Sequence, residues 1–207
     1  MRGGRSSPRV AHFFRRIGAR GWRGTDYFTF SIRSPALRAW IAARLAKRRG
    51  RLLSIGCGSG EMECHLACLG HDIVGLDFSH EMLRRARARG LEWPVQADSY
   101  SLPFRSGSFK AVLLLESIGY LRLGKAFREA ARVLAKDGLL LITSYAGEVE
   151  EHETYRKFRT GEITRALTKV GLRAKERRFL SVKRDAVAEM PSEAGSSLLL
   201  LACRRSR

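Results

Sequence analysis

The sequence predicts an α/β protein in which helices cover both faces of a mostly parallel sheet. Continuous apolar segments, for example residues 111–115 and 139–144, alternate with amphipathic segments of helical length. A glycine cluster directly follows the first apolar segment, as in folds whose strands lead into helices. With 207 residues, 44% of them hydrophobic, the chain can bury one ordinary core. No apolar run approaches the roughly 18–20 residues that span a bilayer.

The first predicted helix follows Ser34-Pro35, a capping residue and a first-turn proline, and ends before Gly50. Beyond it, strands are predicted at 51–55, 72–76, 95–97, 111–115, 139–144, 177–182 and 197–203. Helices are predicted at 61–69, 79–89, 123–134 and 162–170, with Ser79 as a cap. A Pro/Ser/Gly loop is expected to join the last two strands.

The formal net charge of +19 is concentrated near the N-terminus. Residues 1–60 carry +13 and residues 61–207 carry +6. This distribution is typical of a surface for RNA or another polyanion, of attraction to an anionic membrane, or of a solvated arginine-rich face. Residues 1–24 have no acid and read as a basic tail, although a transit peptide has a similar composition. Four cysteines do not form a disulfide framework, so a cytoplasmic location is expected.

The segment 52–60, LLSIGCGSG, places Gly56, Gly58 and Gly60 between a strand and a helix. Such glycines let the backbone turn tightly and approach a ligand, and the helix presents free N–H groups there. A dinucleotide-binding loop prefers a third glycine where this chain has Glu61. A carboxylate is unfavourable beside a pyrophosphate but acceptable beside a ligand without phosphate.

Two acids end the next predicted strands. Asp77 lies 21 residues after Gly56, a distance at which an acid can bind ribose hydroxyls. Asp98, followed by Ser99, could accept a hydrogen bond from an adenine amino group. Either acid alone could be a helix cap or an exposed turn. Together with the glycine loop they indicate a nucleoside site.

These motifs resemble those of class I S-adenosylmethionine-dependent methyltransferases, most closely the subfamily of ubiquinone-biosynthesis enzymes. The matching stretches are 52–60, 73–83 (IVGLDFSHEML), 95–104 (VQADSYSLPF), 108–115 and 126–143 (AFREAARVLAKDGLLLIT). The resemblance implies a Rossmann-like sheet of seven strands with the last one antiparallel, and S-adenosylmethionine as cofactor. It also implies cofactor-site roles for Ser54, Gly56, Gly58, Gly60, Asp77, Phe78, Asp98, Ser99 and Glu116.

One position departs from the family pattern. The family usually has an acid two residues before the first glycine, where this chain has Ser54. A neutral hydroxyl makes weaker bonds to a cofactor ammonium group than a carboxylate does. Glu61 is a conceivable substitute for the missing acid.

The expected organisation is a basic arm and cap helix at 1–50 and a cofactor-binding domain at 51–207, acting on a small molecule. Tyr27, Phe28, Phe30 and Trp40 could line the cover over the acceptor, although Trp40 is better explained by helix packing. Glu148, Glu150, Glu151 and Glu153 could recognise a cationic acceptor or form a solvated turn. The candidate general bases are Glu116, Tyr120 and His152.

Three hypotheses remain open: a small-molecule methyltransferase, one acting on RNA or a membrane-associated substrate, and a non-catalytic cofactor-binding module. The base-methylation signatures Asp/Asn-Pro-Pro-aromatic and Pro-Cys are absent, which disfavours a nucleic-acid base as acceptor. Cys64, His65, Cys68 and His71 lack a second ligand pair at a zinc spacing, so no metal site is expected.

Overall fold

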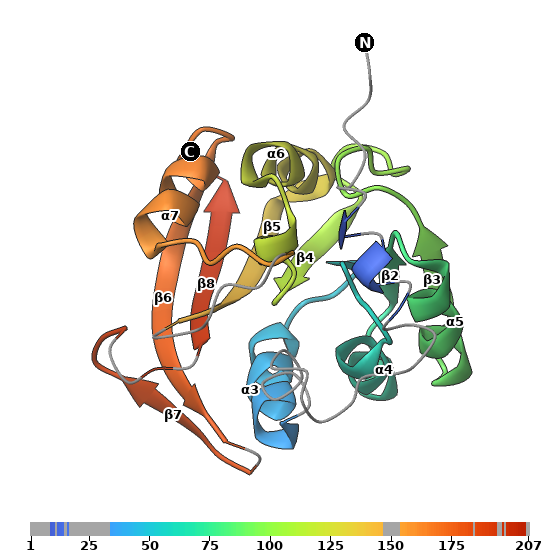
Figure 1. The fold of residues 1–207 in the computed structure, drawn as a ribbon, viewed down its shortest axis with the longest axis horizontal. Helices are drawn as coiled ribbons and strands as arrows, with labels where there is room; N and C mark the ends of the chain where they lie inside the picture. Colours follow the sequence, from blue (N-terminus) through green and yellow to red (C-terminus); the bar gives the residue numbers. More distant parts are fainter. Residues whose placement is uncertain are drawn as a thin grey trace.

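A single eight-stranded sheet, in the order β3-β2-β1-β4-β5-β8-β6-β7, runs through the molecule (Figure 1). The computed structural model describes residues 9, 10, 12–14, 16, 34–146, 154–183, 185–193, 196 and 198–205. The strands are β1 (Leu52–Ile55), β2 (Ile73–Asp77), β3 (Trp93–Gln96), β4 (Phe109–Leu115), β5 (Leu134–Tyr145), β6 (Leu172–Val182), β7 (Val187–Met190) and β8 (Leu198–Arg205). The helices are α3 (Pro35–Leu45), α4 (Glu61–Cys68), α5 (His80–Ala88), α6 (Leu123–Val133) and α7 (Thr160–Thr168), with a short 3-10 helix η2 (Ile118–Tyr120).

The predicted helix starts are confirmed where a capping side chain marks them. The Ser34 hydroxyl accepts from the Leu37 N–H at the start of α3, and Ser79 accepts from Met82 N–H at the start of α5. Both bonds satisfy backbone donors that a helix leaves without an intrahelical partner.

The sheet is mostly parallel, and the predicted antiparallel last strand is confirmed. Strands β1 to β5 pair in parallel, while β8 lies between β5 and β6 and is antiparallel to both. The sheet has one more strand than the expected seven, because β7 folds back on β6 as an antiparallel hairpin. The Lys183 N–H donates to the Ala186 carbonyl (2.9 Å) and closes this turn, inside a segment that the sequence predicts as a loop.

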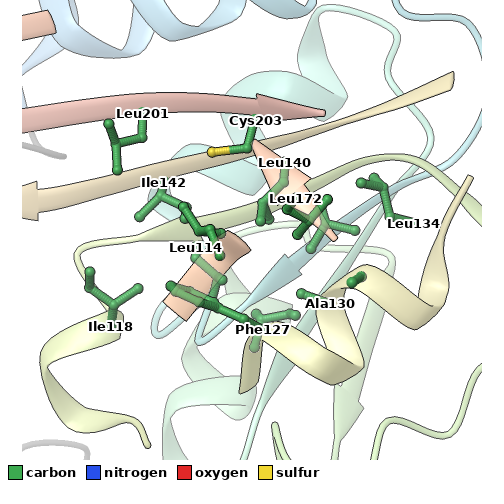
Figure 2. Close-up of a cluster of buried hydrophobic side chains, with 14 of the residues drawn as sticks. Leu114, Ile118, Phe127, Ala130, Leu134, Leu140, Ile142, Leu172, Leu201 and Cys203 are labelled. Carbon is green, nitrogen blue, oxygen red and sulfur yellow. The ribbon is translucent and has the colours of Figure 1, made fainter. Parts of the chain in front are cut away.

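Both faces of the central strands are buried, so adjacent residues belong to different cores. Leu53, Val112 and Leu140 pack with α6 and α7, whereas Leu52, Leu113 and Leu141 pack with α3 and α4. Figure 2 shows the first core, with Phe127 and Ala130 of α6 among side chains from β4, β5, β6 and β8. This two-sided burial is the reason that the strands read as continuous apolar runs.

The strand order reverses direction at β1, which has β2 on one side and β4 on the other. In open α/β sheets, ligands bind in the crevice outside the carboxyl ends of the strands at such a point. The Ser117 hydroxyl, just after β4, donates to the Ile55 carbonyl at the end of β1 (3.0 Å). The two strand ends that flank the crevice are therefore fixed to each other.

Candidate functional site

The glycine loop between β1 and α4 depends on left-handed backbone at three positions. Gly56, Gly58 and Gly60 have φ values of 77°, 54° and 78°. A Cβ on Gly60 would lie 2.9 Å from the Ala86 Cβ, so this glycine lets the loop pack directly on α5. A Cβ on Gly58 would meet nothing within 4 Å. The loop is thus supported at its end by packing and has open space at its middle.

Asp77, the last residue of β2, is buried and holds this loop in place. One carboxylate oxygen accepts from the Gly58 N–H (2.9 Å) and the other from the Ser79 N–H (2.9 Å). Burial raises the pKa of Asp77, and the bonds from these backbone N–H groups oppose that shift. Each carboxylate oxygen has a second lone-pair direction, so Asp77 can still accept from a hydroxyl.

The acids on α4 have different environments. Glu61 is bound by Arg89 (Nη2 to Oε1, 3.0 Å) and by the Ser59 hydroxyl (2.8 Å to Oε2). Glu63 is buried instead, and its carboxyl is hydrogen-bonded to Ser54. Burial raises the pKa of Glu63 to about 7, while the bond to Ser54 lowers it. The carboxyl beside Ser54 is therefore that of Glu63, whereas the sequence suggests Glu61.

The residues expected to surround an adenine follow β2 and β3. Phe78 is half-buried, and its ring meets that of Phe14 edge-on, with centroids 5.7 Å apart. Asp98 is half-buried and accepts from the Tyr100 N–H (3.0 Å), and Ser99 is buried. Both strands end at the crevice, so the fold brings these residues to the same edge of the sheet as the glycine loop.

A cluster of one carboxylate and three tyrosines lies at the carboxyl ends of β4 and β5. Glu116 is buried with a left-handed φ of 54°, and its Oε2 accepts from the Tyr145 hydroxyl (2.8 Å). The Tyr155 ring contacts those of Tyr145 and Tyr120, at centroid distances of 5.6 and 5.1 Å. A Cβ on Gly119 would overlap the Tyr155 ring, so glycine allows this approach.

The two buried phenols of this cluster are held neutral. Burial raises the pKa of Tyr155 to about 12. Burial, together with the neighbouring Glu116, raises the pKa of Tyr145 further. Sequence reasoning missed both tyrosines. Their only signal is that aromatic residues closely follow the fifth apolar segment.

Part of the N-terminal arm lies on this cluster. The Phe14 ring contacts that of Tyr120 at 4.8 Å, and Phe13 packs with Met82 of α5. Of the proposed cover, Trp40 lies on α3 with the Arg44 guanidinium 3.1 Å from its ring centre, which is a packing role. The other predicted cover and acidic-turn residues lie outside the described residues, as does one candidate base: Tyr27, Phe28, Phe30, Glu148, Glu150, Glu151, His152 and Glu153.

Within the described ranges, no three His, Cys, Asp or Glu side chains come together as a metal site would require. None of the helices in the described part of the chain combines the length and apolar character needed to cross a membrane. All four cysteines are free thiols.

The doubly wound sheet, the glycine loop and the acid that ends β2 define a nucleoside-binding α/β domain. Residues 53–142 match a protein family described as "Methyltransferase domain". Over this region the chain is therefore similar to methyltransferases.

Relatives of known name cover the same region. The ubiquinone biosynthesis O-methyltransferase of Xanthomonas oryzae pv. oryzae is 31% identical over 119 residues, which are 54% of this chain and 49% of that protein. The demethylmenaquinone methyltransferase of Thermus thermophilus is 36% identical over 118 residues, 52% of this chain and 53% of that protein. The chain thus spans about half the length of these relatives.

The solved structure of 1,6-didemethyltoxoflavin-N1-methyltransferase from Burkholderia thailandensis has the same fold. It has a TM-score of 0.73 and 18% sequence identity, and covers all of this chain and 94% of its own length. That structure contains bound 1,6-didemethyltoxoflavin and S-adenosylhomocysteine.

Proposed function

We propose that this protein is an S-adenosylmethionine-dependent methyltransferase that acts on a small molecule. The observation that carries the proposal is the charge of the glycine loop. The buried carboxyls beside the loop are those of Glu63 and Asp77, and Glu61 is paired with Arg89. Carboxylates repel a pyrophosphate and attract the ammonium and sulfonium groups of S-adenosylmethionine. A pyrophosphate next to the ionised Glu63 carboxylate is disfavoured by the same repulsion.

The residues present fit this cofactor. Gly58 has open space beside it, so a ligand can approach the backbone there, and Asp77 has lone pairs for the ribose hydroxyls. Phe78 would flank the adenine ring, and Asp98 and Ser99 would contact its edge. Bound S-adenosylmethionine supplies an activated methyl group, so the protein mainly has to position the acceptor and exclude water.

Glu116 is the favoured general base among the candidates. It is the carboxylate of the tyrosine cluster, and the Tyr145 hydroxyl bonded to it remains a neutral donor because its pKa is raised. Tyr145 is thus a positioning residue that orients the Glu116 carboxyl toward the acceptor. Such a base is required where the acceptor loses a proton during attack.

The aromatic surroundings favour a small organic acceptor over a polymer. Tyr120 contacts Tyr155 and the Phe13–Phe14 pair, so a group of aromatic rings adjoins the cluster that contains Glu116. The structural neighbour from Burkholderia thailandensis binds 1,6-didemethyltoxoflavin, a small molecule, which agrees with this choice. We also propose that the protein belongs to the ubiquinone-type subfamily and is cytoplasmic. In the same proposal, residues 1–50 form a basic arm and cap helix, and residues 51–207 form the cofactor-binding domain.

A second candidate acceptor, RNA or a membrane-associated molecule, is favoured by one observation, the +13 charge of residues 1–60. Methyl transfer from labelled S-adenosylmethionine into a fractionated cell extract separates the candidates. We expect label in a fraction of small molecules that resists RNase. Label in RNase-sensitive or lipid material would contradict the small-molecule assignment.

A further inference from the structure

Glu63 is the most deeply buried carboxyl beside the glycine loop. Its side chain projects from the first turn of α4 and is 2% exposed. It is hydrogen-bonded to Ser54 in the middle of β1, a residue that is itself 1% exposed. A side chain held this way stays inside the loop and does not extend into solvent.

No described cation neutralises this carboxyl. From β2 it faces the Asp77 carboxylate, from the loop the Cys57 thiol, and on its own helix Glu61 and Cys64. Arg89, at the end of α5, is paired with Glu61 instead.

A carboxylate in this position is costly without a positive partner. Charged groups removed from water are normally paired, or else remain protonated. The Ser54 hydroxyl gives one hydrogen bond but no charge, and the Asp77 carboxylate adds repulsion. A positively charged ligand in the loop would supply the missing compensation.

We propose that Glu63 is the anion that pairs with a cationic group of S-adenosylmethionine, and that it releases its proton to solvent when this ligand binds. The proposal rests on the proposed function, because it needs that ligand. Ser54 is neutral at the position where the family usually has an acid, and in this proposal Glu63 of α4 supplies the negative charge instead. The carboxyl is protonated in part of the free protein and ionised in the complex, so binding and proton release are linked.

Calorimetric titration with S-adenosylmethionine at pH 6, 7 and 8, in buffers of different ionisation enthalpy, measures this linkage. The ligand's own α-amino group titrates near pH 8 and contributes to the pH dependence of binding. The affinity and proton release of the wild type are therefore compared at each pH with those of Glu63→Gln, whose side chain has a similar shape but cannot ionise. We expect the affinity ratio of wild type to Glu63→Gln to rise about tenfold between pH 6 and 8. Near pH 7 the wild type should release about half a proton more than the variant.

Asp72→Asn is the control, because Asp72 is an exposed acid paired with Arg51 (2.8 Å) just before β2, at the end of this strand away from the loop. It should behave as wild type in pH dependence and proton release. Binding of S-adenosylmethionine with the same pH dependence in wild type and Glu63→Gln would overturn the proposal and leave the proposed function intact. Lack of binding by the folded wild type at any pH would instead overturn the proposed function. A thermal melt of each variant shows that it is folded.

Discussion

At the scale of single residues, the candidate site contains two buried carboxyls, Asp77 and Glu63, that differ in the hydrogen bonds they receive. Asp77 receives two backbone N–H bonds, which favour its ionised form. The hydrogen bonds to Glu63 come from the Ser54 hydroxyl and from its own backbone, and desolvation dominates its pKa. Asp77 is therefore prepared to accept hydroxyl groups, while Glu63 is the titrating group of the loop.

The raised pKa of Glu63 has a consequence for the protein without ligand. Its folded pKa of about 7 lies above the unfolded value near 4.5, so its contribution to stability is full below pH 4.5 and is lost as the pH rises through 7. The loss is on the order of 3 kcal/mol. Urea unfolding should show that the unfolding free energy of the wild type falls between pH 4.5 and 8, and that it falls less in Glu63→Gln. Parallel profiles would contradict the assigned pKa.

Replacing Asp77 by Asn should weaken S-adenosylmethionine binding by about tenfold or more, because charge-assisted bonds are roughly twice as strong as neutral ones. Fluorescence or calorimetric titration measures the change. Asp72→Asn is the control, since Asp72 is an exposed acid paired with Arg51 at 2.8 Å. Equal affinity for both variants would exclude Asp77 from the binding site.

Much of this site can be predicted from the sequence, because glycines and acids at strand ends have local signals. The loop glycines, Asp77, Asp98 and Glu116 all lie at the crevice edge where their spacing predicts them. Glu63 is not predictable in the same way, because its burial depends on the packing of α4 against β1 and β2. The Tyr145 to Glu116 bond likewise joins residues on different strands, whose contact no local pattern encodes.

At the scale of elements, the glycine loop and α5 form one packed unit. Gly60 has no side chain and lies against Ala86, while Arg89 at the end of α5 donates to the Ser59 carbonyl (3.0 Å). The loop is thus held in its ligand-binding shape by a neighbouring helix as well as by its own backbone.

Gly60→Ala should therefore destabilise the protein more than the same change at Gly70. Both glycines have left-handed φ, but the new Cβ at position 70 would meet nothing within 4 Å. We expect a loss of about 1–2 kcal/mol for Gly70→Ala from the backbone alone, and about 1–3 kcal/mol more for Gly60→Ala from overpacking. Chemical denaturation of both variants measures the loss of unfolding free energy. Equal losses would show that the loop can move away from the new Cβ at position 60 without cost.

The hairpin of β6 and β7 is the element that the sequence does not predict. Strand β7 has four residues, half-buried or exposed, and pairs with β6 at the edge of the sheet. A short edge strand lacks the apolar run that identifies the central strands. Its formation depends on pairing with β6, which is tertiary information.

At the scale of the whole molecule, the positive charge and the cofactor site are separate. Residues 1–60 carry +13, whereas the described loop is lined by acids. Under the proposed function, we expect this charge to affect what approaches the crevice and not the methyl transfer itself. Phe13 and Phe14 place part of this basic segment next to Tyr120.

Removal of residues 1–24, with their seven arginines, should weaken binding to polyuridylate and reduce its salt dependence. Fluorescence anisotropy at several salt concentrations measures both. The double change Phe13→Ala and Phe14→Ala keeps every charge and should leave polyuridylate binding unchanged. An unchanged salt slope after the truncation would show that the arm is not the polyanion contact.

The central claim is that the crevice of this fold binds S-adenosylmethionine. Isothermal titration of the purified wild-type chain with S-adenosylmethionine, and separately with NAD, tests it most directly. We predict saturable one-to-one binding of S-adenosylmethionine and no binding of NAD, because the acids of the loop favour a cationic ligand over a pyrophosphate. Absence of binding at millimolar S-adenosylmethionine, or tighter binding of NAD, would contradict the account.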